Sequence, residues 1–174
     1  MDMTAIDKES EESMKRSTTL AVLATLGLSA ALVAPAASQS TERTEIHAYE
    51  VEEGYSKLID ERREGLSPGD MILENLPVFD AATDERVGDT VTIITAVRGP
   101  QSNPLLWIDC EVGLAGGSIT FAGGERMGDM FGGGATFSVT GGTGDYRDVT
   151  GTVTAKHGER DGRDIFTFDF DVVI

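Results

Sequence analysis

The stretch at positions 134–153 reads Gly134-Ala135-Thr136-Phe137-Ser138-Val139-Thr140-Gly141-Gly142-Thr143-Gly144-Asp145-Tyr146-Arg147-Asp148-Val149-Thr150-Gly151-Thr152-Val153. Apolar and polar residues alternate on both sides of three glycines, and an aromatic residue, Tyr146, follows the glycines. Alternation with a period of two is typical of β-strands that bury one face. Glycines at this spacing allow the positive φ that a tight turn requires. The stretch therefore predicts a β-hairpin, and it lacks the Lys-Ser/Thr of a phosphate-binding loop.

Similar runs continue along the chain from about residue 44 onward. They predict strands at about 45–51, 69–80, 86–98, 105–114, 117–123, 134–140, 149–157 and 164–173. The charged segment 53–68 shows no strong period and predicts at most a helical turn at 55–64, and the glycine-rich segment 123–134 predicts a flexible connection. No long crossover helix separates the runs, so we expect neighbouring strands to pair antiparallel.

About eight antiparallel strands can either close into a barrel or split into a sandwich. A closed barrel of this size has room for one small ligand. The last run shows how its faces divide, because Phe166, Phe168 and Phe170 alternate with polar residues. Three adjacent exposed phenylalanines would form an association patch, so we expect this face to lie inside the barrel or in a subunit contact.

Three segments resemble the allene oxide cyclase family and the related dirigent-type β-barrels, in the order in which that family has them. They are Glu45–Glu53, Gly69–Asp80 with the following Arg86-Val87-Gly88, and Phe137–Val153 with its Gly-Gly-Thr-Gly-x-Tyr motif. Bacterial spirotetronate-type [4+2] cyclases resemble relatives of this family that are built on the same barrel. The resemblance implies an all-β, eight-stranded antiparallel up-and-down barrel at 44–174. It also implies an apolar substrate bound in the lumen without a cofactor, and a homo-oligomer, either a dimer or a trimer.

The resemblance also suggests two catalytic residues. Glu50 matches the luminal glutamate whose charge assists ring closure, and its alternation with Ile46 and Ala48 places it on the inward face independently. A carboxyl group among apolar neighbours would have a raised pKa and could act as an acid, a base or a fixed charge. The alternative is a solvated Glu50. Asn75 matches a luminal asparagine that orients the substrate, and its alternative role is an amide bonded to the backbone.

Apolar residues on the inward faces are the candidates for substrate binding: Ile46, Ala48, Ile94, Phe137, Phe166, Phe168 and Phe170. The chain departs from the family at Glu52, where the family has asparagine, and at Ile94, which aligns with a pocket cysteine. The family's Ser-Pro water-binding segment has no clear counterpart at 53–57. The resemblance therefore supports the barrel more strongly than it supports a fatty-acid epoxide as the substrate.

The remaining reactive residues have simpler interpretations. Cys110 lies in a strand pattern and is expected to be a buried structural thiol. His157 falls in an expected turn and should be exposed, and His47 should lie on the outer face. Acidic pairs two residues apart, such as Asp169 and Asp171, are typical of a solvated strand face, so no metal site is expected.

The composition limits the partners of the protein. The 174 residues include 30 acidic and 14 basic residues, which gives a formal net charge of −16. Such a surface repels nucleic acids and anionic lipids. The single cysteine cannot form an intrachain disulfide bond.

The N-terminal part, 1–38, has the pattern of a targeting segment. Met14-Lys15-Arg16 precedes an apolar run from Thr18 to Val33, and small residues follow at 34–38. This order predicts a secretory signal that is cleaved after Ala36, a secreted protein, and no membrane span after processing. Residues 1–13 would then be a polar leader, or the start of the protein has been assigned too early and Met14 is the true first residue. The alternative is a helix at 14–38 that is retained as a lid over the barrel mouth of a cytoplasmic enzyme.

Two functions follow from these observations. The first is a cofactor-independent cyclase or isomerase that folds a small apolar or polyene substrate into a reactive conformation. The second is a secreted dirigent-like or lipocalin-like protein that binds a small molecule without catalysis of its own.

Overall fold

The computed structural model describes residues 43–60 and 65–174. The leader at 1–13 and the signal-like segment at 14–38 lie outside the described residues. The described part contains a short helix, α2 (Met127–Gly132). Its strands are β1 (Arg43–Val51), β2 (Tyr55–Ile59), β3 (Met71–Asp80), β4 (Arg86–Arg98), β5 (Leu105–Leu114), β6 (Gly117–Arg126), β7 (Ala135–Gly144), β8 (Thr150–Arg160) and β9 (Arg163–Val173).

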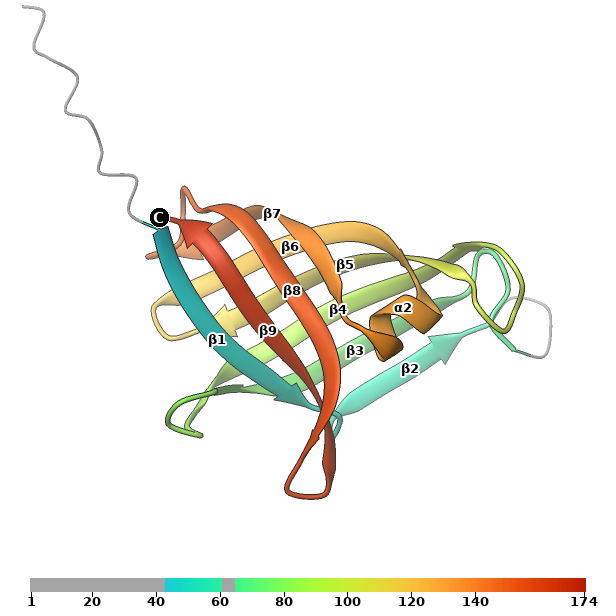
Figure 1. The fold of residues 1–174 in the computed structure, drawn as a ribbon, viewed down its shortest axis with the longest axis horizontal. Helices are drawn as coiled ribbons and strands as arrows, with labels where there is room; N and C mark the ends of the chain where they lie inside the picture. The colour runs from blue at the N-terminus through green and yellow to red at the C-terminus, as the bar shows by residue number, and fades with distance from the viewer. Residues whose placement is uncertain (1–42, 61–64) are drawn as a thin grey trace, which may run out of the picture. The chain divides into compact units, whose positions relative to one another are not determined.

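The strands form one antiparallel sheet that closes on itself. The order is β1-β9-β8-β7-β6-β5-β4-β3-β2, and β1 pairs with β3 as well as with β9. The β1–β3 pairing, for example Glu50 opposite Val78, closes eight strands into a barrel and leaves β2 outside it (Figure 1). The predicted barrel is confirmed, and the sandwich alternative is excluded.

β2 corrects the prediction of a helical turn at 55–64. Tyr55 lies opposite Asn75 and Ile59 opposite Met71, so β2 pairs with the first half of β3. β1 reaches only the last residues of β3, and it leaves the peptide groups of 71–75 without a partner on that edge. Unpaired backbone groups favour strand addition. The sequence did not show this strand because β2 is mostly exposed and has no apolar alternation.

The glycine-rich connection is also more ordered than predicted. β6 continues to Arg126, and α2 follows directly. α2 contacts β6 and β8 and buries Met130, so it lies over one end of the barrel wall (Figure 1). No helix within 43–60 and 65–174 is long and apolar enough to span a membrane.

The predicted hairpin at 134–153 is present, with its turn later than expected. β7 continues through the glycines to Gly144, and the turn follows at 145–149. Gly144 has a φ of 59°, as a turn glycine should. Gly142 has another role: a Cβ atom there would lie 2.4 Å from the carbonyl oxygen of Tyr146 and 2.7 Å from that of Ser118. The glycines therefore let three backbone segments approach one another.

Alternation along the strands builds the core. In β5 the residues Leu106, Ile108, Cys110 and Val112 are buried, and the residues between them are exposed. Aromatic rings fill the interior, since the ring of Phe121 lies 5.4 Å from that of Phe137 and 5.9 Å from that of Phe168. Edge and offset contacts of this kind stabilise a core beyond the burial of surface. The inward placement of the Phe166–Phe170 face is thus explained by packing.

Candidate functional site

A cavity of about 220 Å³ lies inside the part of the barrel wall next to α2. Five predicted site residues line it: Glu50, Ile94, Phe137, Phe166 and Phe168. Its other lining residues are Glu52, Leu66, Ile72, Glu74, Leu76, Thr92, Leu106, Ile108, Cys110, Phe121, Met127, Met130, Phe131 and Ala155. Most of these are apolar. The lining residues Glu52 and Phe131 are exposed, so the cavity opens between the end of β1 and α2.

Three predicted binding residues lie in the core instead. Ala48 and Phe170 are buried, and Ile46 packs against the same core cluster, but none of them lines the cavity. The alternation placed them correctly on the inward face. The lumen at that end is filled by side chains, as small barrels usually are. Among the described residues, the cavity therefore occupies one end of the barrel, and packed side chains fill the other.

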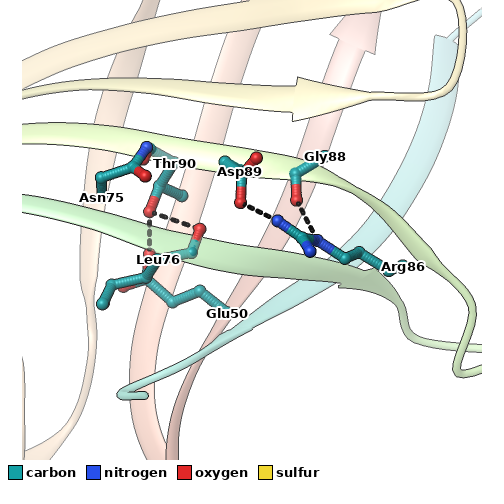
Figure 2. A network of polar contacts seen from close by, with 7 residues as sticks. All are labelled: Glu50, Asn75, Leu76, Arg86, Gly88, Asp89 and Thr90. Carbon is teal, nitrogen blue, oxygen red and sulfur yellow. Dashed lines mark hydrogen bonds and ion pairs between the residues drawn. The ribbon is translucent and has the colours of Figure 1, made fainter. Parts of the chain in front are cut away.

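Glu50 is the buried carboxyl of the site, with 6% of its surface exposed. The hydroxyl group of Thr90 on β4 donates a hydrogen bond of 2.6 Å to Oε2 of Glu50, and this hydroxyl also lies 3.4 Å from the carbonyl oxygen of Leu76 (Figure 2). Burial raises the pKa of Glu50 to about 7. The bond from Thr90 lowers this pKa in part, and the charges of Glu74 and Glu52 raise it. Glu50 can therefore exchange a proton near neutral pH.

The structure places Asn75 differently from its expected luminal position. Its side chain is exposed, and its amide donates a 2.8 Å hydrogen bond to the carbonyl oxygen of Thr90, which matches the alternative role in the backbone. Asn75 points outward because it alternates with Glu74 and Leu76, and both of these line the cavity.

Glu74 is the polar residue that the sequence analysis missed on this strand. Ser56 of β2 donates a 3.2 Å hydrogen bond to its carboxylate. Burial raises the pKa of Glu74, the bond from Ser56 lowers it, and the charge of Glu52 raises it. The signal was present in the alternation of Ile72, Glu74 and Leu76, which share one face of β3.

His157 corrects a second expectation. It lies within β8, opposite Phe166, and its side chain is only 29% exposed. Its ring centroid is 5.3 Å from those of Phe131 and Phe166, and its Nε2 is 3.8 Å from a carboxylate oxygen of Glu52. The prediction of an exposed turn was wrong because the turn begins later, at Asp161-Gly162, where both φ angles are positive. His47, in contrast, is exposed as predicted and lies 2.7 Å from Asp169.

Cys110 is buried and contributes its sulfur to the cavity wall. The hydroxyl of Thr92 donates a hydrogen bond of 3.1 Å to its Sγ. Burial raises the pKa of the thiol, so the group is uncharged at neutral pH and is a poor nucleophile. Within the described ranges, no group of three or more His, Cys, Asp or Glu side chains is arranged to hold a metal ion.

Solved structures share this fold, although their sequences differ strongly. No protein-family model matches the sequence, and neither does any curated protein. A pyocyanin demethylase matches with a TM-score of 0.58 at 17% identity, over 74% of this chain and 99% of that chain. The pterocarpan synthase dirigent protein PsPTS1 matches with a TM-score of 0.57 at 18% identity, over 76% of this chain and 95% of that chain.

A cyclase has the same fold. The Diels Alderase AbmU from Streptomyces koyangensis matches with a TM-score of 0.57 at 12% identity, over 79% of this chain and 71% of that chain. The described part of this chain thus has a β-barrel fold that dirigent proteins and [4+2] cyclases also have, as the sequence resemblance predicted.

Proposed function

We propose that this protein is a cofactor-independent cyclase or isomerase that holds a small, mainly apolar molecule in the cavity next to α2. The observation that carries the proposal is the carboxyl of Glu50, which is buried in an otherwise largely apolar cavity and is held by Thr90. The barrel fold shared with a Diels Alderase supports it.

The chemistry follows from confinement and from one titratable group. A cavity lined by the rings of Phe121, Phe137 and Phe168 restricts the shape of a flexible substrate and brings its reacting atoms together. Glu50 in its neutral form can donate a hydrogen bond or a proton to a substrate oxygen or nitrogen. In its charged form it stabilises positive charge that develops as a ring closes.

A binding protein without catalysis is the second candidate. The exposed ring of Phe131, 48% accessible at the cavity opening, favours it, because a reactive intermediate is better protected in a closed site. The proposed signal at 14–38 also suits a protein that meets its ligand outside the cell. Both candidates require the same occupied cavity.

Native mass spectrometry of the protein mixed with small-molecule extract of its host tests the occupied cavity. Ile94→Trp places a large ring in the cavity, and Ile93→Trp makes the same change at the neighbouring, exposed position. We expect a bound small molecule with the wild type and with Ile93→Trp, and at least about tenfold less with Ile94→Trp. Equal binding by both variants would contradict the proposal.

Catalysis is tested next with the captured molecule. The wild type should convert it to an isomer of the same mass, which chromatography separates, and Glu50→Gln should reduce the rate at saturating substrate by about a hundredfold. Binding without conversion by the wild type would favour the second candidate. Conversion at the wild-type rate by Glu50→Gln would exclude Glu50 as the catalytic group.

A further inference from the structure

We propose that the cavity selects ligands that carry a positive charge, namely an apolar body with a protonated or quaternary nitrogen. This inference rests on the proposed function, since it names the class of molecule that the same cavity takes.

The charges of the lining all have one sign. Glu50, Glu52 and Glu74 contribute carboxyl groups, and the described lining residues include no lysine, arginine or histidine. His157 lies beside the opening, outside the lining, with its Nε2 3.8 Å from Glu52. The chain as a whole has a formal net charge of −16, so no distant excess of basic residues offsets them. An anionic ligand would lose its hydration and meet like charges, whereas a cation would gain partners.

The buried carboxyl has an unused acceptor. Among the described residues, Thr90 is the one donor to Glu50, and its bond reaches Oε2. The other oxygen is accessible on the cavity side, since no side-chain nitrogen or oxygen atom of the described residues is both fully buried and without a partner. A buried carboxylate is costly unless a cation or further donors satisfy it. An ammonium group in the cavity would supply the positive charge and the hydrogen-bond donors.

The aromatic lining is a second, independent argument. Phe121, Phe137 and Phe168 surround the inner cavity, and Phe131 and Phe166 lie at its opening. The faces of aromatic rings attract organic cations, especially methylated or aromatic nitrogen groups that are weakly hydrated. Rings and carboxylates together match a cation with an apolar body better than they match a neutral hydrocarbon, which would leave the carboxyl groups desolvated.

The three carboxyl groups occupy different depths. Glu50 is buried, Glu74 is partly buried, and Glu52 is exposed at the opening. We therefore assign Glu52 to the attraction of the ligand and assign Glu50 and Glu74 to contact with its nitrogen. Charges at an opening mainly accelerate association, and desolvated charges mainly slow dissociation.

The test uses three naphthalene probes with the same ring and different head groups: 2-naphthylmethylammonium, 2-naphthylmethanol and 2-naphthoate. Calorimetric titration of the whole protein with each probe measures the dissociation constant. We expect the ammonium probe to bind at least about tenfold more tightly than the alcohol and the carboxylate to show no measurable binding.

Two variants identify the groups responsible. Glu74→Gln should weaken ammonium binding by about five- to tenfold and leave alcohol binding unchanged. Glu111→Gln makes the same change at an exposed position of β5, outside the cavity lining, and should leave both affinities unchanged. A larger loss in Glu111→Gln than in Glu74→Gln would show that only general surface charge acts, and it would overturn the inference.

The outcomes separate this inference from the proposed function. Binding of the alcohol or the carboxylate as tightly as the ammonium probe, abolished by Ile94→Trp, would overturn the charge preference while the ligand cavity remained supported. No binding of any of the three probes would overturn the charge preference, while the comparison of Ile94→Trp with Ile93→Trp in native mass spectrometry decides separately whether the cavity is a small-molecule site.

Discussion

Glu50 and Thr90 lie forty residues apart in the chain, and their side chains meet at 2.6 Å in the closed barrel. The contact joins β1 to β4 across the lumen side of β3, next to the carbonyl oxygen of Leu76 (Figure 2). A buried carboxyl with one strong donor is held in place but is still costly when charged. The pair therefore connects the stability of the barrel with its proposed chemistry.

Glu50→Gln should change the pH dependence of stability. The pKa of Glu50 is raised from 4.5 to about 7 in the folded protein. Its contribution to stability is therefore fully present below the unfolded value and is lost as the pH rises through the folded value. We expect the variant to be more stable than the wild type by up to about 3 kcal/mol above pH ~8, with little difference below pH ~4.

Urea unfolding at several pH values measures this difference. Glu45→Gln is the matched control, because Glu45 lies on the same strand with an exposed side chain. A constant difference between wild type and Glu50→Gln across this pH range would mean that the carboxyl does not titrate as described.

Thr90→Val should raise the pKa of Glu50 further, because it removes the hydroxyl that stabilises the charged form. We expect the folded state to lose about 2 kcal/mol above neutral pH and less in acid. Carbon-detected NMR titration of the Glu50 carboxyl measures the pKa directly.

Thr92→Val serves as the comparison for this change. Thr92 is the next inward threonine on β4, and its hydroxyl donates to Cys110 rather than to Glu50. An equal shift of the Glu50 pKa in both variants would show that the hydroxyl of Thr90 has no specific role.

At the scale of elements, the hairpin of β7 and β8 depends on backbone contact. Gly142 lies where β6, β7 and the turn after Gly144 come together, and Gly117 of β6 pairs with Gly144. These glycines leave no room for a side chain. The register of this part of the barrel is therefore set by the absence of Cβ atoms as much as by apolar alternation.

Gly142→Ala should destabilise the barrel by about 2 kcal/mol or more, because the new Cβ atom would overlap the carbonyl oxygens of Ser118 and Tyr146. Gly132→Ala in α2 adds the same atom where nothing lies within 4 Å, and should remain within ~1 kcal/mol of the wild type. Thermal and urea unfolding of both variants test this. Equal stabilities would contradict the close backbone approach.

α2 shows how a short element can form a site without any sequence signal of its own. Its six residues contain two glycines, which are poor helix formers. Packing of Met130 into the core holds the helix on β6 and β8. This placement puts the rings of Phe131, His157 and Phe166 together at the cavity opening.

At the scale of the whole molecule, the expected processing of 14–38 predicts a mature protein that begins at Ala37. Intact-mass measurements on cell extract and culture medium should detect this species in the medium, because the segment has the basic, apolar and small-residue order of a secretory signal. A full-length species confined to the cell extract would contradict export and would support the retained lid.

Local patterns determined most of the fold. The period of two and the glycine-rich breaks predicted eight of the nine strands in the described part of the chain, with bounds within a few residues, and they also predicted the burial of Cys110. This was possible because alternation reports directly which face of a strand is buried. The inward position of Glu50 followed from the same rule.

Only the tertiary structure decided the rest. β2 forms because closure of β1 on β3 leaves part of the β3 edge unpaired. Residues 55–59 carry no pattern of their own that would predict this pairing. The sequence predicted that Asn75 lines the lumen, but its neighbour Glu74 does so instead. Which of the two points inward depends on the orientation of β3 in the closed barrel. His157 lies within β8 rather than in a turn because the turn between β8 and β9 begins only at Asp161. Pairing register, closure and the Thr90–Glu50 contact join residues far apart in the chain, so their energies exist only once the barrel has formed.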